Sequence, residues 1–174
     1  MRTIDAVLME IDQEAGITRR VLERVPADLL TWKPHEKSMS LGQLALHVAR
    51  SPGGVAGMLV TDEFGMTLDE LSYIPAPETW VDIMNAHDES VANAKRILSG
   101  LDDTAVRATW SFKVAGAVVF SAPKIGIIRS LVLNHWYHHR GQLSVYLRLL
   151  DVPVPSIYGA SADENPYVTD GARR

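Results

Sequence analysis

Residues 134–142 read NHWYHHRGQ, so half of the six histidines in the chain fall within five consecutive positions. The residues on either side carry apolar side chains at helical spacing. Pro123 precedes them, and proline is favourable near the start of a helix. The pattern predicts one long helix over about residues 123–150, with the histidine cluster inside it.

The helical phase separates the three histidines of this cluster. At about 100° per residue from Ile128, His135 falls at about 340° and His139 at about 20°, in the middle of the predicted core face. His138 falls at about 280°, on the edge of that face. The residues predicted to point away from the core are Tyr137, Arg140 and Arg148.

Two histidines four positions apart on a helix bring both rings within reach of one ion, because their Cβ atoms lie about 6 Å apart. H-x-x-x-H is the two-ligand platform of H-E-x-x-H metalloproteases, but the glutamate that serves them as general base is missing here. A protease of that kind is therefore not expected. The same spacing also fits histidines that are hydrogen-bonded in a core or exposed on a surface, so this segment alone leaves metal binding open.

The remaining histidines differ in their surroundings. His47, in LGQLALHVAR, is the candidate third ligand because it falls at the border of the apolar face of its own predicted helix. His35 lies in the loop after Trp32, and His87 lies in the acidic stretch AHDES. We expect His35 and His87 to face solvent without a role in the site.

Apolar spacing predicts three more long helices, over about residues 3–25, 41–60 and 78–98. With the last helix they indicate an all-α protein, a four-helix bundle. Residues 109–121, TWSFKVAGAVVFS, are rich in β-branched and aromatic residues and could form a short β-hairpin or an irregular insertion before the last helix. The length suits one domain over residues 1–174.

Two stretches are expected to depart from regular helix. Ser40 and Gln43 fit a capping box that starts the second helix. Further along that helix, the run SPGG contains Pro52, which lacks an N–H group and is expected to kink or interrupt it. The tail, about residues 151–174, contains three prolines and two glycines and is expected to be irregular.

Composition excludes several classes of function. The net charge of −4 comes without any block of Lys and Arg, so neither nucleic acid nor an anionic membrane is an expected partner. The absence of cysteine excludes disulfides and thiolate metal sites, so any metal must bind His, Asp, Glu or backbone oxygen. No signal-like segment and no run of about 20 apolar residues is present, which indicates a soluble, cytoplasmic protein.

Three stretches together resemble the DinB/YfiT-like superfamily, whose members are metal-binding four-helix bundles. TWKPHEKSMSLGQLALHVA resembles the family's Trp-containing loop, its Ser-initiated second helix and its first histidine ligand. NHWYHHRGQLSVYLRLLDVPVP resembles its H-x-x-x-H-R-G-Q helix, and PSIYGASADE resembles the tail that follows. The similarity covers nearly the whole chain. It implies a DinB-like bundle in which His47, His135 and His139 hold one divalent metal ion.

The resemblance implies a metal-dependent enzyme that transfers a low-molecular-weight thiol or hydrolyses a small substrate. Three histidines would leave open positions on the ion, as in catalytic zinc sites. Imidazole suits several transition metals, of which we expect zinc or nickel. Two alternatives stay open: a non-catalytic, stress- or damage-inducible protein whose metal is structural, and a protein in which the histidines bind no metal.

Other residues are candidates for the surroundings of the site. In the same helical projection from Ile128, Gln142 falls at about 320° and could orient a histidine ligand, although a plain packing role fits equally well. Trp136, His138 and Tyr146 are expected to line the pocket, and Trp136 and Tyr146 also fit an ordinary core.

Three further segments could affect the site or the assembly of the protein: the tail, the SPGG run and the run before the last helix. Asp163 and Glu164 could reach the site from the tail or cap the exterior of the fold. SPGG, directly after the first ligand, departs from the family pattern and could shift His47 or widen the pocket. The resemblance also implies a homodimer, and the run VAGAVVF could supply its interface or form an internal hairpin.

Overall fold

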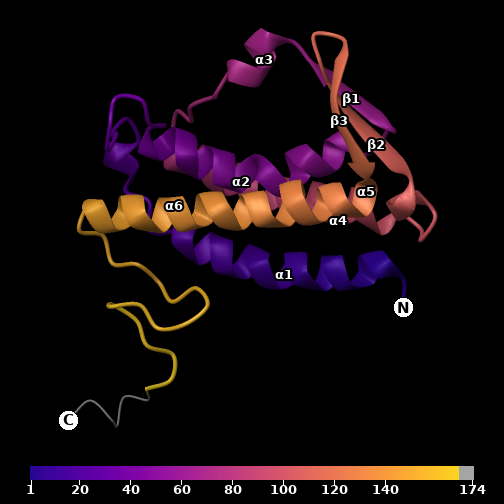
Figure 1. Cartoon of the computed structure of the whole chain (residues 1–174). Helices are drawn as coiled ribbons and strands as arrows, with labels where there is room; N and C mark the ends of the chain where they lie inside the picture. Colours follow the sequence, from indigo (N-terminus) through magenta and orange to yellow (C-terminus); the bar gives the residue numbers. More distant parts are fainter. Residues whose placement is uncertain (169–174) are drawn as a thin grey trace.

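The protein is built around four long helices (Figure 1). Its structure, a computed structural model, describes residues 1–168. Helices α2 and α6 lie side by side, α1 lies along the other side of α6, and α4 packs against both α1 and α2 (Figure 1). Their bounds are α1 Thr3–Leu22, α2 Leu41–Met58, α4 Trp80–Ser99 and α6 His135–Leu149. Shorter helical pieces are the 3₁₀ turns Ala27–Leu29 and Ala105–Arg107 and helix α3, Leu68–Ser72. None of the helices in residues 1–168 has the length and hydropathy of a membrane-spanning segment.

The start of α2 follows from its capping residues. The Ser40 hydroxyl accepts a hydrogen bond from the Gln43 backbone N–H at 3.1 Å, and the Gln43 side chain accepts one from the Ser40 N–H at 2.9 Å. The predicted capping box is therefore confirmed. The predicted interruption is wrong, because Pro52 lies inside α2 and the helix continues to Met58.

The glycine after Pro52 explains why SPGG stands in this helix. A Cβ atom at Gly53 would lie 2.4 Å from the Ser90 carbonyl oxygen on α4, so only glycine allows the two helices to approach this closely. The Ser90 hydroxyl accepts from the Gly53 N–H at 2.8 Å and donates to the Arg50 carbonyl at 3.0 Å. The run therefore joins α2 to α4 through a buried serine.

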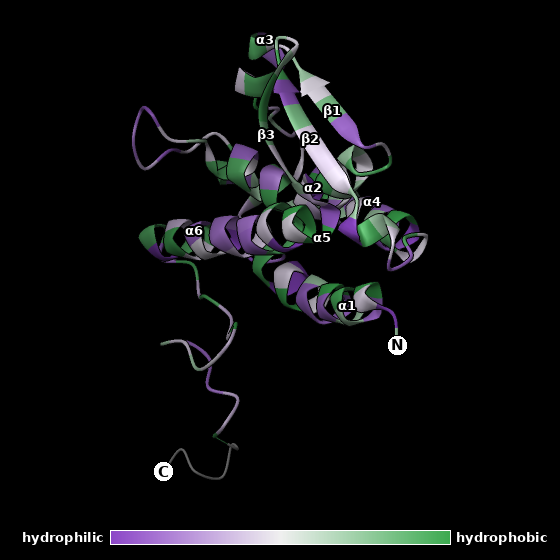
Figure 2. Cartoon of the chain, turned by 45° about the vertical axis from the view of Figure 1, so that its right-hand side comes forward, coloured by the Kyte–Doolittle hydropathy of each residue, from purple (hydrophilic) through white to green (hydrophobic). Residues whose placement is uncertain are grey.

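A small sheet corrects the all-α prediction. The expected hairpin forms from β2 (Thr109–Val114) and β3 (Ala117–Pro123), and Ala115 and Gly116 turn the chain with positive φ angles of 49° and 84°. The sequence reasoning missed β1 (Glu63–Met66), which pairs with β2 in parallel and completes the order β1-β2-β3. Figure 2 shows the sheet and α3 projecting to one side of the helices.

The last helix has three parts instead of one regular form. Helix α5 (Lys124–Ile127) leads into a π-helical segment (Ile128–Asn134), and α6 follows without a break. A π-helix bonds i to i+5 and holds more residues per turn than an α-helix, so the phase of α6 differs from that of a uniform helix. The buried residues of α6 are Trp136, Arg140, Leu143 and Leu147.

This change of phase overturns two predictions. Arg140 was expected to point away from the core, but it is only 1% exposed, and Tyr137 is half-buried. The pair His135 and His139 was expected in the middle of the core face. Instead, both histidines lie half-buried on the flank of that face that meets α2.

The tail after α6 contains no helix or strand up to residue 168, as its prolines predict. Two carboxylates attach it to the bundle. Asp163 pairs with Arg148 of α6 and accepts from the Val154 N–H at 2.8 Å, and Glu164 pairs with Arg20 of α1. Of the two open roles for these acids, the structure shows the one that fixes the outside of the fold.

Candidate metal centre

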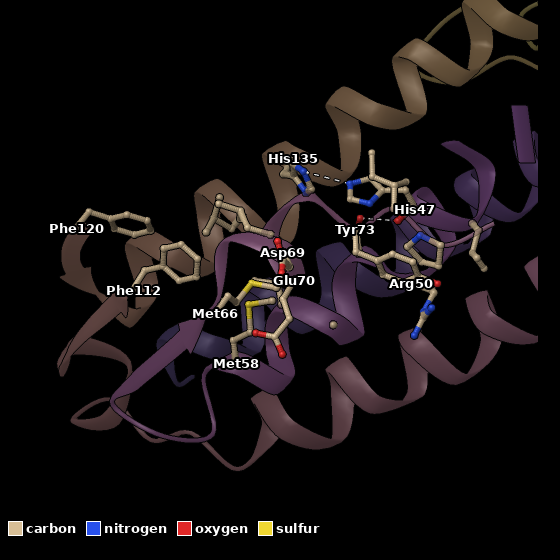
Figure 3. Close-up of a pocket in the computed structure, with 18 of the residues that line it drawn as sticks. His47, Arg50, Met58, Met66, Asp69, Glu70, Tyr73, Phe112, Phe120 and His135 are labelled. Carbon is tan, nitrogen blue, oxygen red and sulfur yellow. Dashed lines mark hydrogen bonds between the residues drawn. The ribbon is translucent and has the colours of Figure 1, made fainter. Parts of the chain in front are cut away.

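Three histidine side chains from two helices converge on one point. His47 extends from the middle of α2, and His135 and His139 extend from the first two turns of α6. The Nε2 atom of His135 lies 3.4 Å from Nε2 of His47 and 3.0 Å from Nε2 of His139. Figure 3 shows His47 and His135 facing each other across the end of a pocket. Their ligand atoms all lie within 4.8 Å of one another, so the three side chains could bind one metal ion together.

The spacing of these nitrogens fits a transition metal ion. Zinc binds histidine nitrogen at about 2.0–2.1 Å in tetrahedral geometry, which separates two ligand nitrogens by about 3.3 Å. The two separations at His135, 3.0 Å and 3.4 Å, bracket that value. Imidazole is also a ligand that zinc, nickel and copper accept, so the donor set and its geometry agree.

The protonation states also favour a cation between the rings. Burial, followed by repulsion from the other two histidines, lowers the pKa of His47 from 6.5 to about 4. Burial, followed by His139 and His138, lowers the pKa of His135 to about 4, and burial likewise lowers the pKa of His139. At neutral pH the three rings are therefore uncharged, which is the form that binds metal.

Gln142 fixes the orientation of one of these rings. Its side-chain oxygen lies 2.7 Å from Nδ1 of His139, so Nδ1 donates its proton there and Nε2 keeps a lone pair directed at the other two histidines. Of the two roles considered for Gln142, the structure shows the hydrogen bond to a histidine ring. His135 differs, because its Nδ1 is buried and has no hydrogen-bond partner within residues 1–168.

A pocket of about 1130 Å³ opens directly beside His47 and His135. Its walls come from α2, from the π-helical segment, from the β2–β3 hairpin and from the stretch that follows β1 (Figure 3). Gly54 of the SPGG run lies in the wall, and no atom lies within 4 Å of where its Cβ would be. SPGG thus leaves the pocket wide on one side of α2, while Gly53 brings α4 close on the other.

The residues expected to line this pocket lie elsewhere. Trp136 is fully buried in the core, because the π-helical segment turns it toward the interior. His138 is exposed, with its ring 4.9 Å from that of His139. Tyr146 is half-buried, packs edge-on against Trp32 at 5.7 Å and donates a hydrogen bond to the Met39 carbonyl.

The two other histidines were expected to face solvent. His35 is exposed, and its Nδ1 accepts a hydrogen bond from the Lys37 N–H at 3.1 Å. The prediction for His87 is wrong, because it is only 3% exposed and lies between α1 and α4 beside Arg19 and Asp88. Its spacing of four and three residues from Ile83 and Ser90 would have placed it on the buried face.

The sequence reasoning also missed the far end of the pocket. Aromatic and methionine side chains form it, from α2, β1, β2 and β3, and each stands in a short strand or at a helix end without a recognisable motif. Only the hairpin prediction over residues 109–121 pointed to this region. These residues are Met58, Met66, Trp110, Phe112 and Phe120.

Comparisons with known proteins agree with this fold. The sequence matches the DinB superfamily over residues 10–143 and the DinB family over residues 126–167. It is 23% identical over 165 residues to the uncharacterized protein YrdA of Bacillus subtilis strain 168, covering 94% of this chain and 92% of that protein.

Solved structures give the same result. A DinB-like protein from Bacillus cereus ATCC 10987 superimposes with a TM-score of 0.69 at 23% identity, over 90% of this chain and 99% of that one. The DinB-like protein YjoA of Bacillus subtilis gives a TM-score of 0.65 at 19% identity, over 85% and 96% of the two chains. Since the superfamily match spans most of the sequence and the fold is shared, the protein belongs to the DinB superfamily.

Proposed function

We propose that this protein is a metal-dependent enzyme in which His47, His135 and His139 hold one divalent transition metal ion, zinc or nickel. The observation that carries the proposal is the convergence of the three Nε2 atoms, 3.0 Å and 3.4 Å apart at His135, beside a pocket large enough for a substrate. The reaction is the transfer of a low-molecular-weight thiol or the hydrolysis of a small molecule.

The surroundings of the histidines support a catalytic role over a structural one. Structural zinc sites are closed by four protein ligands, whereas three ligands leave a position open. Within residues 1–168 the cluster contains three ligands, and two of them, His47 and His135, line the pocket. A small molecule in the pocket therefore has direct access to the centre of the cluster.

An ion at this site would act as a Lewis acid and favour the deprotonated form of a nucleophile at neutral pH. The protein's own groups supply position and protonation state. Gln142 holds the His139 ring, and burial keeps the three imidazoles neutral. Because the chain has no cysteine, a thiol for transfer comes from a separate low-molecular-weight molecule.

Metal content tests the site directly. We expect about one equivalent of zinc or nickel in protein purified without a polyhistidine tag, and a loss of that metal in His47→Ala and His135→Ala. His138→Ala is the matched control, because His138 is an exposed histidine on the same helix and should leave the metal content unchanged. A parent protein without stoichiometric metal contradicts the proposal.

Turnover then separates catalysis from a structural metal. Metal-loaded protein is expected to turn over in a thiol-transfer or hydrolase assay, and His135→Ala is expected to abolish it. The alternative, a non-catalytic protein, predicts that chelation lowers the melting temperature strongly while no assay detects turnover. Equal turnover by His135→Ala and the parent would exclude the metal-dependent mechanism.

We also propose a homodimer formed through the β2–β3 hairpin, in the cytoplasm. In support of this interface, Val118 and Val119 of β3 are 56% and 59% exposed and offer apolar surface to a second copy of the chain.

A further inference from the structure

Apart from the histidines, the buried polar side chains that line the pocket are already hydrogen-bonded within the protein. The Trp110 side chain donates its Nε1 proton to the Met58 carbonyl at 2.9 Å. The Ser51 hydroxyl donates to the His47 carbonyl at 2.6 Å. Both residues line the pocket and are at least nine-tenths buried, so their hydrogen-bonding protons are already used within the protein.

The charged residues that line the pocket lie at its rim. Arg50, Asp69 and Glu70 are all exposed. The Glu70 carboxylate accepts hydrogen bonds from the backbone N–H and the hydroxyl of Thr67 at 2.8 Å and 3.0 Å. Charge is thus available to a ligand where it leaves the pocket, and not along its walls.

The end of the pocket away from the histidines is built for apolar contact. Phe112 and Phe120 lie with ring centroids 5.6 Å apart, and Trp110 stacks on Phe112 at 6.1 Å. Met58 and Met66 lie beside these rings, and methionine adapts its shape to apolar partners (Figure 3). Figure 3 shows Phe112 and Phe120 at one end and His47 at the other.

Size and polarity together limit what can fill this space. Pockets for drug-sized ligands usually measure about 300–1,000 Å³. The volume of about 1130 Å³ is therefore more than a simple thiol or a water molecule needs. A peptide is a poor occupant, because each residue would bring an N–H and a carbonyl group against the buried side chains of the wall, which apart from the histidines have no free hydrogen-bonding proton.

We infer that the pocket binds the apolar body of a drug-sized small molecule whose one strongly polar group is directed at His47 and His135. This inference names the substrate class of the proposed enzyme, and its polar end rests on that proposed function. The substrate is a hydrophobic compound with a metal-binding or reactive group at one end. Its apolar body lies along the aromatic wall.

A homologous series of n-alkyl hydroxamates, from butyl to octyl, tests both ends separately. Binding is measured by displacement of the neutral probe N-phenyl-1-naphthylamine from zinc-loaded protein and from metal-free protein. Burial of each added methylene group should strengthen binding about fourfold. This dependence on chain length should be the same with and without zinc. Zinc should increase the affinity for every hydroxamate in the series by the same factor.

Variants place the alkyl chain in the pocket. Met58→Trp fills the space beside the aromatic wall, and Phe120→Asp puts a charge on a side chain that is 38% exposed and tolerant of change. Either substitution should reduce the gain to less than about twofold per methylene. Val145→Asp is the control, because Val145 is exposed on α6 outside the pocket and should leave the series unchanged.

The two proposals fail in different ways. Affinity that does not depend on chain length, or a dependence that both pocket variants leave intact, overturns the apolar pocket. A normal dependence on chain length with no effect of zinc contradicts the metal site alone. His139→Ala checks this separation, since His139 does not line the pocket and its loss should remove only the effect of zinc.

Discussion

Two clusters of polar side chains flank helix α6, and they differ in how completely their groups are paired. On the side of α1, Arg140 and Glu14 form an ion pair at 2.6 Å, with both side chains at most 5% exposed. On the side of α2, the three histidines direct their Nε2 atoms at one another, and Nδ1 of His135 has no partner within residues 1–168.

The cluster around Arg140 uses nearly all of its hydrogen-bonding capacity. The guanidinium also donates to the Thr18 hydroxyl at 3.0 Å and to the Tyr158 hydroxyl, and Tyr158 donates to Glu14 at 2.9 Å. The rings of Tyr137 and Tyr158 lie 5.2 Å and 5.1 Å from the Arg140 Cζ atom. A buried cation that is satisfied in this way fixes the position of α6 against α1 and the tail.

The difference indicates that one side of α6 stabilises the fold and the other side carries the candidate binding site. A paired cluster needs no further component, whereas three neutral imidazoles that face one another leave lone pairs for a cation. His139 of one cluster and Arg140 of the other are adjacent in the sequence, yet their side chains point to opposite neighbours. The arginine therefore stabilises the fold, and the histidines are the candidates for binding.

The largest expected effect comes from breaking the paired cluster. Arg140→Met leaves the Glu14 carboxylate buried without its counter-ion, which should lower the free energy of unfolding by about 3–5 kcal/mol. Urea denaturation measures the loss. Arg148→Met is the matched control on the exposed side of the same helix, and it should cost no more than about 1 kcal/mol. Equal losses in the two variants would show that the buried pair has no special weight.

The histidine cluster should instead make metal-free protein sensitive to acid. The pKa of His47 and of His135 is about 4 in the folded protein and 6.5 in the unfolded chain. The unfolded chain therefore binds more protons between these values, so the contribution of these two histidines to stability is fully present above pH 6.5 and is lost as the pH is lowered toward 4. Thermal melts over this range measure the loss.

Substitution of both residues assigns this acid sensitivity. His47→Ala combined with His135→Ala should reduce the slope of the pH profile, to which His139 and His87 still contribute because burial also lowers their pKa, whereas His35→Ala, at an exposed site, should leave it as in the parent. A parent profile that stays flat between pH 6.5 and 4 would contradict the lowered pKa values.

The smallest effect concerns the residue that holds one ring in place. Gln142→Ala removes the acceptor at Nδ1 of His139 and should weaken zinc binding about tenfold, or about 1.4 kcal/mol, with little change in unfolding. Isothermal titration calorimetry measures the affinity. Gln142→Glu keeps an acceptor and should bind zinc like the parent. If Gln142→Ala binds equally well, the hydrogen bond has no role in orienting the ligand.

Much of this arrangement could be predicted from local patterns. The Ser40–Gln43 capping box sets the start of α2, and the spacing of His135 and His139 predicts that their two rings lie together, as the structure shows. These features depend on residues within a few positions of one another. Local geometry alone determines them. His47, 88 residues before His135, was added from its position on its own predicted helix and from the family resemblance.

Features that depend on contacts between distant segments were missed. The partner of Arg140 lies 126 residues away on α1, so nothing near Arg140 in the sequence shows that it is buried. Strand β1 pairs with β2 across a separation of 48 residues, from Glu63 to Ser111, and has only four residues. The prediction that His135 and His139 lie in the middle of the core face was wrong because it assumed 100° per residue throughout, including the π-helical segment.

The π-helical segment also has a consequence for how such a pocket changes in evolution. Insertion or deletion of one residue within a packed helix normally turns everything beyond it away from its partners. A π-helical segment holds more residues per turn than an α-helix, so it accommodates an extra residue without breaking the helix. Leu131, within residues 128–134, lies in the pocket wall, and the histidines of α6 follow directly after this segment. Length changes in this segment could therefore reshape the apolar end of the pocket in related sequences while the three histidines keep their mutual geometry.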